Sequence, residues 1–185
     1  MTADPQGELL DVPPEYGTPS RALVWAGVRT RLEESKRYWL ATTRADGRPH
    51  TVPIDGLWLD DACWFGGTQT VWRRNLLVDG RACLHLPDAD AAVIVEGLCE
   101  MVKPDARMVE RLIQGSKEKY GYSVPASAYA GGVWCLRPRK VMAWSSLPED
   151  ATRFVFPAAS AGETSQGPGV SSSPSTRCAQ AASSS

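Results

Sequence analysis

A turn rich in glycine and threonine that leads into an arginine pair is the part of the sequence best suited to chemistry. The stretch Phe65-Gly-Gly-Thr-Gln-Thr-Val-Trp-Arg-Arg-Asn75 predicts a strand end, a turn and the start of a helix that carries Arg73 and Arg74. Glycine lets the backbone approach a ligand closely, and helix amides, threonine hydroxyls and an arginine fork all donate hydrogen bonds to a phosphate. The pattern indicates a phosphate-binding loop; its alternative is an ordinary turn followed by a solvent-facing arginine pair.

A second candidate is the preceding stretch Arg48-Pro-His-Thr-Val-Pro53. Pro49 and Pro53 lack backbone N–H donors, so this strand cannot be a fully paired central strand. The free backbone groups from position 50 to position 53 can meet the polar edge of a planar ring. The alternative interpretation is an ordinary edge strand with a bulge.

Short strands separated by turns must position these residues. Asp46-Gly47 is a strong hairpin signal, and Pro104 suits the first turn of a helix. Successive hairpins with few helices predict a mainly β fold, a closed or nearly closed antiparallel barrel. We expect strands at 38–43, 48–59, 62–66, 81–86, 91–102 and 133–145, and helices at 20–36, 70–78 and 104–120.

The chain divides into one folded domain and two tails. Residues 1–16 contain three prolines and predict a flexible or loosely docked leader. Residues 157–185 are mostly Ser, Ala, Gly and Pro, which bury too little apolar surface to offset chain entropy, so we expect a disordered tail. The domain that binds a ligand is therefore predicted to span residues 17–156.

The overall composition excludes several classes of function. Twenty basic and twenty-one acidic side chains give a net charge of −1, which argues against a broad nucleic-acid or membrane surface. No apolar run is long enough to span a membrane, and the start lacks the features of a signal peptide, so we expect a cytoplasmic protein. Five dispersed cysteines and only two histidines predict structural thiols and no metal site.

Several segments together resemble the pyridoxamine 5'-phosphate oxidase-like family. Tyr38-Trp-Leu-Ala-Thr-Thr-Arg-Ala-Asp-Gly-Arg-Pro-His50 resembles its first hairpin, and Gly66-Gly-Thr followed by Thr70-x-Trp-x-Arg-Asn-Leu76 is similar to its cofactor-phosphate loop and helix. Val93-Ile-Val-Glu-Gly97 and Arg137-Pro-Arg-Lys-Val-Met-Ala-Trp144 look like later strands of the same fold. The resemblance spans about residues 16–156, which is essentially the whole folded part.

This resemblance implies a six-stranded antiparallel split barrel with peripheral helices, a homodimer, and FMN or an 8-hydroxy-5-deazaflavin-type coenzyme bound between the subunits. Where many relatives carry Ser/Thr-Arg-Lys, this chain has Thr70-Val71-Trp72, which argues against tight FMN binding and favours either the alternative deazaflavin or weak occupancy of the site. Arg74 lies where the family retains an arginine, and it is therefore expected to matter more than Arg73. The implied cofactor-binding residues are His50, Thr51, Val52, Pro53, Gly67, Thr68, Thr70, Arg73, Arg74 and Asn75.

The leading functional hypothesis is an oxidoreductase that transfers a hydride between the bound cofactor and a small organic substrate. The cofactor carries the difficult chemistry, so no side chain needs to be a nucleophile or a base. No catalytic residue is assigned, and His50, Tyr120 and Tyr122 are the candidate proton donors. Trp134 and Trp144 are expected to form the apolar surface that closes the cofactor site in the dimer.

Two other hypotheses remain open. The first is a non-catalytic flavin-, deazaflavin- or haem-binding or carrier protein on the same fold, because one fold hosts several functions. His85 is then a candidate haem ligand, against the alternative that it is an ordinary strand side chain. The second is a structural dimer that has lost its ligand, which Val71 and Trp72 would explain.

Overall fold

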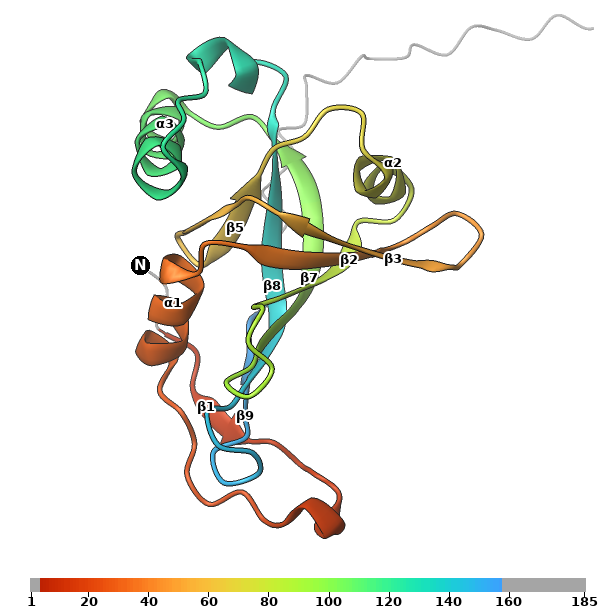
Figure 1. Ribbon diagram of the computed structural model, residues 1–185, viewed down its shortest axis with the longest axis vertical. Helices are drawn as coiled ribbons and strands as arrows, with labels where there is room; N and C mark the ends of the chain where they lie inside the picture. Colours follow the sequence, from red (N-terminus) through yellow and green to blue (C-terminus); the bar gives the residue numbers. More distant parts are fainter. Residues whose placement is uncertain (1–3, 158–185) are drawn as a thin grey trace, which may run out of the picture.

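A strongly curved antiparallel sheet with three α-helices around it forms the protein (Figure 1). The computed structural model describes residues 4–157, so the predicted tail at 157–185 lies outside the described residues except for Pro157. The strands are β1 (Gly7–Leu9), β2 (Tyr38–Thr43), β3 (Pro49–Ile54), β4 (Leu57–Leu59), β5 (Ala62–Phe65), β6 (Arg81–His85), β7 (Val93–Val102), β8 (Val133–Ala143) and β9 (Thr152–Val155). The helices are α1 (Trp25–Glu34), α2 (Val71–Val78) and α3 (Ala106–Tyr120), with short 3-10 helices η1 (Pro14–Tyr16) and η2 (Ala126–Tyr129).

All the strands belong to one nine-stranded sheet, against six predicted strands. The predicted strand at 48–59 is divided by a bend at Asp55 and Gly56 into β3, which pairs with β2, and β4, which pairs with β5. β1 and β9 are the other two additions, and they pair with each other. Because β3 and β4 do not pair with one another, the sheet curls without closing, which confirms the predicted split-barrel class.

Two segments near the N-terminus have a structure that differs from the prediction. Backbone hydrogen bonds to residues far away in the sequence hold both of them in place. Gly7–Leu9, inside the predicted leader, forms β1, and the Leu10 amide donates to Ala151 O at 2.8 Å. Helix α1 begins at Trp25 instead of Ser20. The Ser20 and Arg21 amides both donate to Glu149 O, so this part of the chain is extended along the turn before β9 and cannot be helical.

The longest ladder of the sheet, between β7 and β8, contains a β-bulge. Glu96 pairs with Lys140 and Gly97 pairs with Pro138, so Arg139 is the extra residue on β8. A proline without an N–H donor is tolerated at such a bulge. The Arg139 carbonyl instead accepts a hydrogen bond from the Phe156 amide at 2.9 Å, which anchors the end of the described chain.

Alternating side chains on the strands build two apolar clusters on opposite faces of the sheet. The larger cluster fills the curved interior and includes Phe65, Trp72 and Trp134. The smaller cluster lies under α3 and includes Trp64, Leu112 and Val133. Adjacent residues of β5 and of β8 therefore contribute to different clusters, and the ends of these strands separate two chemical environments.

The expected dimer surface at Trp134 and Trp144 is wrong for Trp134. Its side chain is only 3% exposed and packs inside its own chain against Trp72, so it offers no apolar surface to a partner. Trp144 is half-buried. The pattern of aromatic residues on this strand reflects the core of the monomer, because Trp134 faces the inside of the curved sheet.

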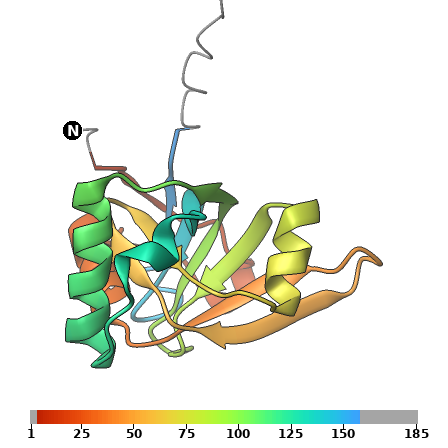
Figure 2. The ribbon, with the colours of Figure 1, turned by 90° about the horizontal axis from the view of Figure 1, so that it is seen from above.

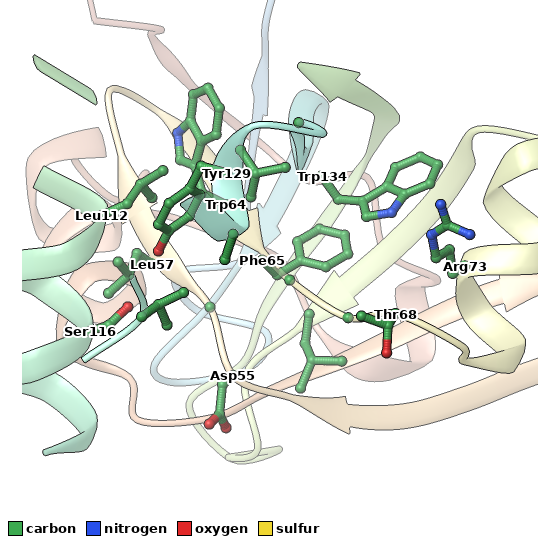
Figure 3. A pocket seen from close by; sticks show the side chains of 18 of the residues that line it. Asp55, Leu57, Trp64, Phe65, Thr68, Arg73, Leu112, Ser116, Tyr129 and Trp134 are labelled. Carbon is green, nitrogen blue, oxygen red and sulfur yellow. The ribbon is translucent and has the colours of Figure 1, made fainter. Parts of the chain in front are cut away.

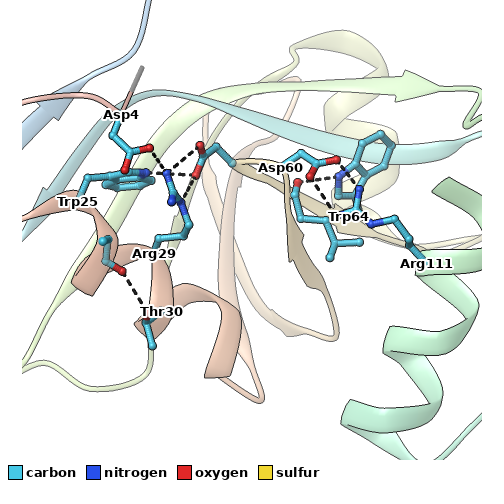
Figure 4. A network of polar contacts seen from close by, with 10 residues as sticks. Asp4, Trp25, Arg29, Thr30, Asp60, Trp64 and Arg111 are labelled. Carbon is cyan, nitrogen blue, oxygen red and sulfur yellow. Dashed lines mark hydrogen bonds and ion pairs between the residues drawn. The ribbon is translucent and has the colours of Figure 1, made fainter. Parts of the chain in front are cut away.

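An acidic turn joins the β4–β5 hairpin to two helices (Figure 4). Asp60 and Asp61 both have positive φ, of 53° and 54°, as a tight two-residue hairpin turn requires. Asp61 accepts hydrogen bonds from Arg29 at 2.9 Å and from the Trp25 indole at 3.2 Å, both on α1. Asp60 accepts two from Arg111 on α3, and these bonds lower the pKa of its carboxyl. The turn thereby fixes the strands that carry Leu57 and Trp64.

The remaining composition-based predictions can be compared with the described part of the chain. No helix within residues 4–157 is long and apolar enough to cross a membrane. The cysteines of that range are free, and burial raises the pKa of the Cys99 thiol to about 12 and that of Cys135 to about 11. Such thiols stay protonated at neutral pH and act as buried apolar groups. Cys178 lies outside the described residues.

Candidate functional site

A cavity of about 880 Å³ lies between α2 and α3, around the end of β5 and the beginning of β8. Figures 1 and 2 show the two helices on opposite sides of this end of the sheet. In Figure 3, Thr68 and Arg73 lie at the α2 end of the cavity, and Leu57, Leu112 and Ser116 lie at the α3 end. The two ends therefore have different chemistry and are described in turn.

The α2 end contains the predicted glycine-threonine turn. Thr70 caps α2, where its hydroxyl accepts a hydrogen bond from the Arg73 amide at 3.3 Å. Thr68 and Arg73 line the cavity, and Arg73 is half-buried. A Cβ atom added at Gly67 would lie 2.4 Å from the Trp72 ring, so this position must be glycine for the turn to pack on the aromatic core. The α2 end thus has donors for an anion next to an aromatic wall.

That wall is formed by Phe65, Trp72 and Trp134. The Trp72 ring meets Phe65 at a centroid distance of 5.2 Å and Trp134 at 6.3 Å, both edge-to-face. The Trp134 indole nitrogen is buried and has no hydrogen-bond acceptor among the described residues. Figure 3 places this indole beside Phe65 and Arg73 at the cavity. A buried donor without an acceptor is costly, and Trp134 shares this feature with Trp58, which does not line the cavity.

The α3 end is mostly apolar. Helix α3 contributes Leu112 and Ser116, one turn apart, and both are buried. Leu57 and Trp64 from the β4–β5 hairpin lie opposite, and Trp64 is anchored by its indole N–H, which donates to Leu59 O at 3.2 Å. Tyr129 of η2 also lines this end. The hydroxyls of Ser116 and Tyr129 are the polar side-chain groups that the described residues of α3 and η2 bring to this end.

A polar cluster borders the cavity at the bend between β3 and β4. Asp55 pairs with Arg37 at 2.9 Å and accepts a hydrogen bond from the Tyr122 hydroxyl at 3.1 Å. The Tyr122 ring stacks on Tyr120 with centroids 5.5 Å apart, and the Tyr120 hydroxyl donates to Gly56 O at 2.8 Å. Burial raises the pKa of Tyr120 to about 12 and also raises the pKa of Tyr122. Both phenols are therefore protonated at neutral pH, and each donates its one proton within the protein, Tyr120 to Gly56 O and Tyr122 to Asp55.

Lys119 supports this cluster from behind the cavity wall. Its ammonium donates to Tyr38 Oη at 2.9 Å, Gly56 O at 3.1 Å and Glu33 O at 3.2 Å. Burial lowers the pKa of Lys119 to about 8. With three acceptors for three N–H donors, the ammonium is fully satisfied and holds the bend at Gly56 in place.

The structure distributes the predicted site residues over three places. Those that line the large cavity are Pro53, Gly67, Thr68 and Arg73. Arg74 and Asn75 border a second, smaller cavity of about 360 Å³ beside the β2–β3 hairpin. The buried Asn75 amide donates to Thr42 Oγ1 at 2.9 Å, which ties α2 to β2.

Of the remaining predicted residues, Thr70 caps α2 and lines neither cavity, and the other three lie on β3. Neither cavity includes His50, Thr51 or Val52. The His50 Nδ1 atom lies 3.4 Å from Arg44, and burial together with that positive charge lowers the pKa of this imidazole. Pro53 and Ile54, at the end of the same strand, are the residues of β3 that line the large cavity.

Sequence reasoning missed the α3 end of the cavity and misjudged the role of Trp134. One signal was present, because Leu112, Ser116 and Tyr120 follow at intervals of four residues and therefore share a helix face. That spacing could not show which strands the face meets. The contribution of β5 required its pairing with β8, which joins segments about 70 residues apart. Within the described residues, no cluster of His, Cys, Asp or Glu could hold a metal ion.

The model of the pyridoxamine 5'-phosphate oxidase family matches residues 25–145, which include every residue of the large cavity. The chain belongs to the pyridoxamine 5'-phosphate oxidase family. No curated protein matches it by sequence.

Solved structures agree on the fold of this family. A Clostridium acetobutylicum protein related to general stress protein 26, of the pyridoxinephosphate oxidase family, is 19% identical, with a TM-score of 0.54 over 71% of this chain and 93% of that one. A conserved hypothetical protein of Mycobacterium tuberculosis is 21% identical, with a TM-score of 0.55 over 67% and 86% of the two chains. A haem-binding protein of Mycobacterium smegmatis is 20% identical, with a TM-score of 0.53 over 69% and 55%.

Proposed function

We propose that this protein binds FMN, or an 8-hydroxy-5-deazaflavin-type coenzyme, in the large cavity and works as an oxidoreductase on a small organic substrate. The observation that carries this proposal is the buried Trp134 N–H, which lacks an acceptor and lies beside Arg73 at the α2 end. A flavin or deazaflavin ring is planar and rich in hydrogen-bond acceptors, and it carries a phosphate-bearing chain. When bound, such a ring supplies hydride transfer.

The residues at the α2 end suit both parts of such a molecule. The Arg73 guanidinium and the Thr68 hydroxyl are donors for a phosphate, and the first turn of α2 adds its positive dipole end. Phe65, Trp72 and Trp134 provide an aromatic wall for a ring. Arg73 takes the phosphate role that the sequence resemblance assigned to Arg74, because Arg74 borders the other cavity.

Titration with FMN and with riboflavin tests this assignment. FMN is expected to bind at least about tenfold more tightly, because a charge-assisted phosphate contact is worth about 1.5–3 kcal/mol. Flavin fluorescence provides the measurement, and a phosphate-bearing deazaflavin is titrated in parallel to decide between the two cofactors. Equal binding of FMN and riboflavin would contradict a phosphate site at the α2 end.

Replacement of Trp134 by Phe tests the orphaned donor, and the chain provides a matched control. Trp58 is also 3% exposed and also has a buried indole N–H without an acceptor, but it does not line the cavity. Both Trp→Phe variants should lower the melting temperature to a similar extent, because each removes the same buried volume. Only Trp134→Phe should weaken FMN binding, by about fivefold to tenfold for one lost hydrogen bond. The same loss of FMN affinity in both variants would mean that the effect is structural.

Haem binding is a second candidate, which the haem-binding structural relative favours. Neither histidine lines the large cavity, however. The His85 ring stacks on Trp39, and its Nδ1 atom lies 2.8 Å from Leu86 O, on a different part of the sheet. A haem in this cavity would therefore have no histidine ligand from its own chain. Incubation with haemin should give no sharp Soret band at the stoichiometry of the protein, and such a band would favour haem over flavin.

The homodimer remains part of the proposal, with a different surface. Leu77 and Val78 at the end of α2 are 61% and 73% exposed, and Val78 borders the smaller cavity. Exposed apolar side chains on a small domain are typical of an interface, and a two-fold axis would use the same patch twice. This surface replaces the buried Trp134 in the dimer hypothesis.

A further inference from the structure

The α3 end of the cavity forms a chamber of its own, separate in chemistry from the cofactor end. We call it the α3 chamber, and its walls are Leu57, Trp64, Leu112, Ser116, Tyr129 and Val133. Because successive residues of a strand face opposite sides, Trp64 lines this chamber while Phe65 faces the aromatic wall at the α2 end. Two ligands can thus meet at the end of β5 without sharing side chains.

The charges around the cavity are distributed unevenly. Among the described residues that line it, only Arg73 and Asp55 are charged, and Arg73 lies at the α2 end. Asp55 borders the bend and is neutralised by Arg37 at 2.9 Å. Lys119 is turned away behind the wall, where three oxygen acceptors occupy its ammonium. The α3 chamber therefore contains no cation that could pair with a phosphate or a carboxylate.

The size of the cavity is compatible with a ligand at each end. A cavity of about 880 Å³ is near the upper limit of typical ligand pockets, which hold roughly 300–1,000 Å³. We propose that, given the cofactor assigned above to the α2 end, the α3 chamber binds the substrate, and that this substrate is uncharged, flat and mostly apolar. The hydroxyls of Ser116 and Tyr129 supply the polar contacts that orient it.

The proposed substrate differs in charge from the phosphorylated substrate after which the family is named. A phosphorylated substrate would place its phosphate among Leu112, Trp64 and Val133 without a counter-charge, and burial of an unpaired charge is strongly unfavourable. The one cavity arginine is assigned to the cofactor. An aromatic quinone or a comparable neutral ring compound has the matching chemistry, because its faces are apolar and its edge oxygens accept hydrogen bonds from hydroxyls.

Binding of 1-naphthol and of 1-naphthyl phosphate, measured by calorimetry on the full-length protein with and without FMN, tests the proposal. We expect 1-naphthol to bind at least about tenfold more tightly than its phosphate ester, and to bind together with FMN.

Ala128 lines the cavity from the exposed side of η2, so Ala128→Trp can fill the chamber without changing the core. Its matched control is Ser127→Trp, because Ser127 is the exposed neighbour that does not line the cavity.

The variants distinguish this proposal from the cofactor assignment. Ala128→Trp should weaken 1-naphthol binding by about tenfold or more and change FMN affinity by less than about twofold, while Ser127→Trp changes neither. Specific 1-naphthol binding in a protein that does not bind FMN would support the chamber and contradict the cofactor. Tighter binding of the phosphate ester, or unchanged 1-naphthol affinity in Ala128→Trp, would overturn the chamber. A third result would also overturn the chamber: 1-naphthol does not bind, and sedimentation shows a dimer that Ala128→Trp converts to a monomer. A second copy of the chain would then fill the α3 chamber.

Discussion

Gly97→Ala is expected to lower the melting temperature by roughly 6–12 °C. A Cβ atom at position 97 would lie 2.2 Å from Arg137 O and 3.2 Å from a Leu136 methyl group. The carbonyl belongs to the β8 backbone at the bulge opposite, so it cannot move without disturbing the longest ladder of the sheet. Overpacking against backbone costs about 3 kcal/mol or more.

Gly27→Ala is the matched control for this change. No atom lies within 4 Å of a Cβ added there, and the residue is inside helix α1. Alanine in an exposed helix position is favoured over glycine by about 0.5–1 kcal/mol, so this variant should melt about 1–4 °C higher than the parent. Calorimetric melting of both variants provides the measurement. A Gly97→Ala protein that melts within about 2 °C of the parent would show that the bulge adapts.

Arg73→Gln should weaken FMN binding by about tenfold to a hundredfold, whereas Arg74→Gln should change it by less than about twofold. The two arginines are adjacent on α2, but only Arg73 lines the large cavity, while Arg74 borders the smaller one. Adjacent helix residues point about 100° apart, so one phosphate cannot use both in the same way. Fluorescence titration of each variant measures the effect on FMN affinity.

Riboflavin provides the internal control for the arginine variants. It lacks the phosphate, so its affinity should change by less than about twofold in Arg73→Gln if the guanidinium contacts the phosphate and nothing else. A larger loss of FMN affinity in Arg74→Gln than in Arg73→Gln would favour the assignment based on the family resemblance. The phosphate would then bind in the smaller cavity beside the β2–β3 hairpin.

Local sequence patterns determined most of the secondary structure. The strands on either side of Asp46-Gly47, the cap at Thr70 and the helix that begins after Pro104 all form close to where their patterns indicate. These signals are local because capping and turn conformations depend on a few neighbouring residues. The family resemblance was equally readable from the sequence, and the family match confirms it.

Only the tertiary structure decided which residues share a cavity. Arg73 and Arg74 are the same type of residue and are adjacent in sequence. The packing of Trp72 against Phe65 and Trp134 determines which of the two arginines reaches the large cavity. Ser20 is a good helix cap by type, yet its amide is used by the Glu149 carbonyl. Contacts between residues that are far apart in sequence override local preference in both cases. The α3 chamber has the same origin, because it exists only where α3, the β4–β5 hairpin and the first residues of β8 meet.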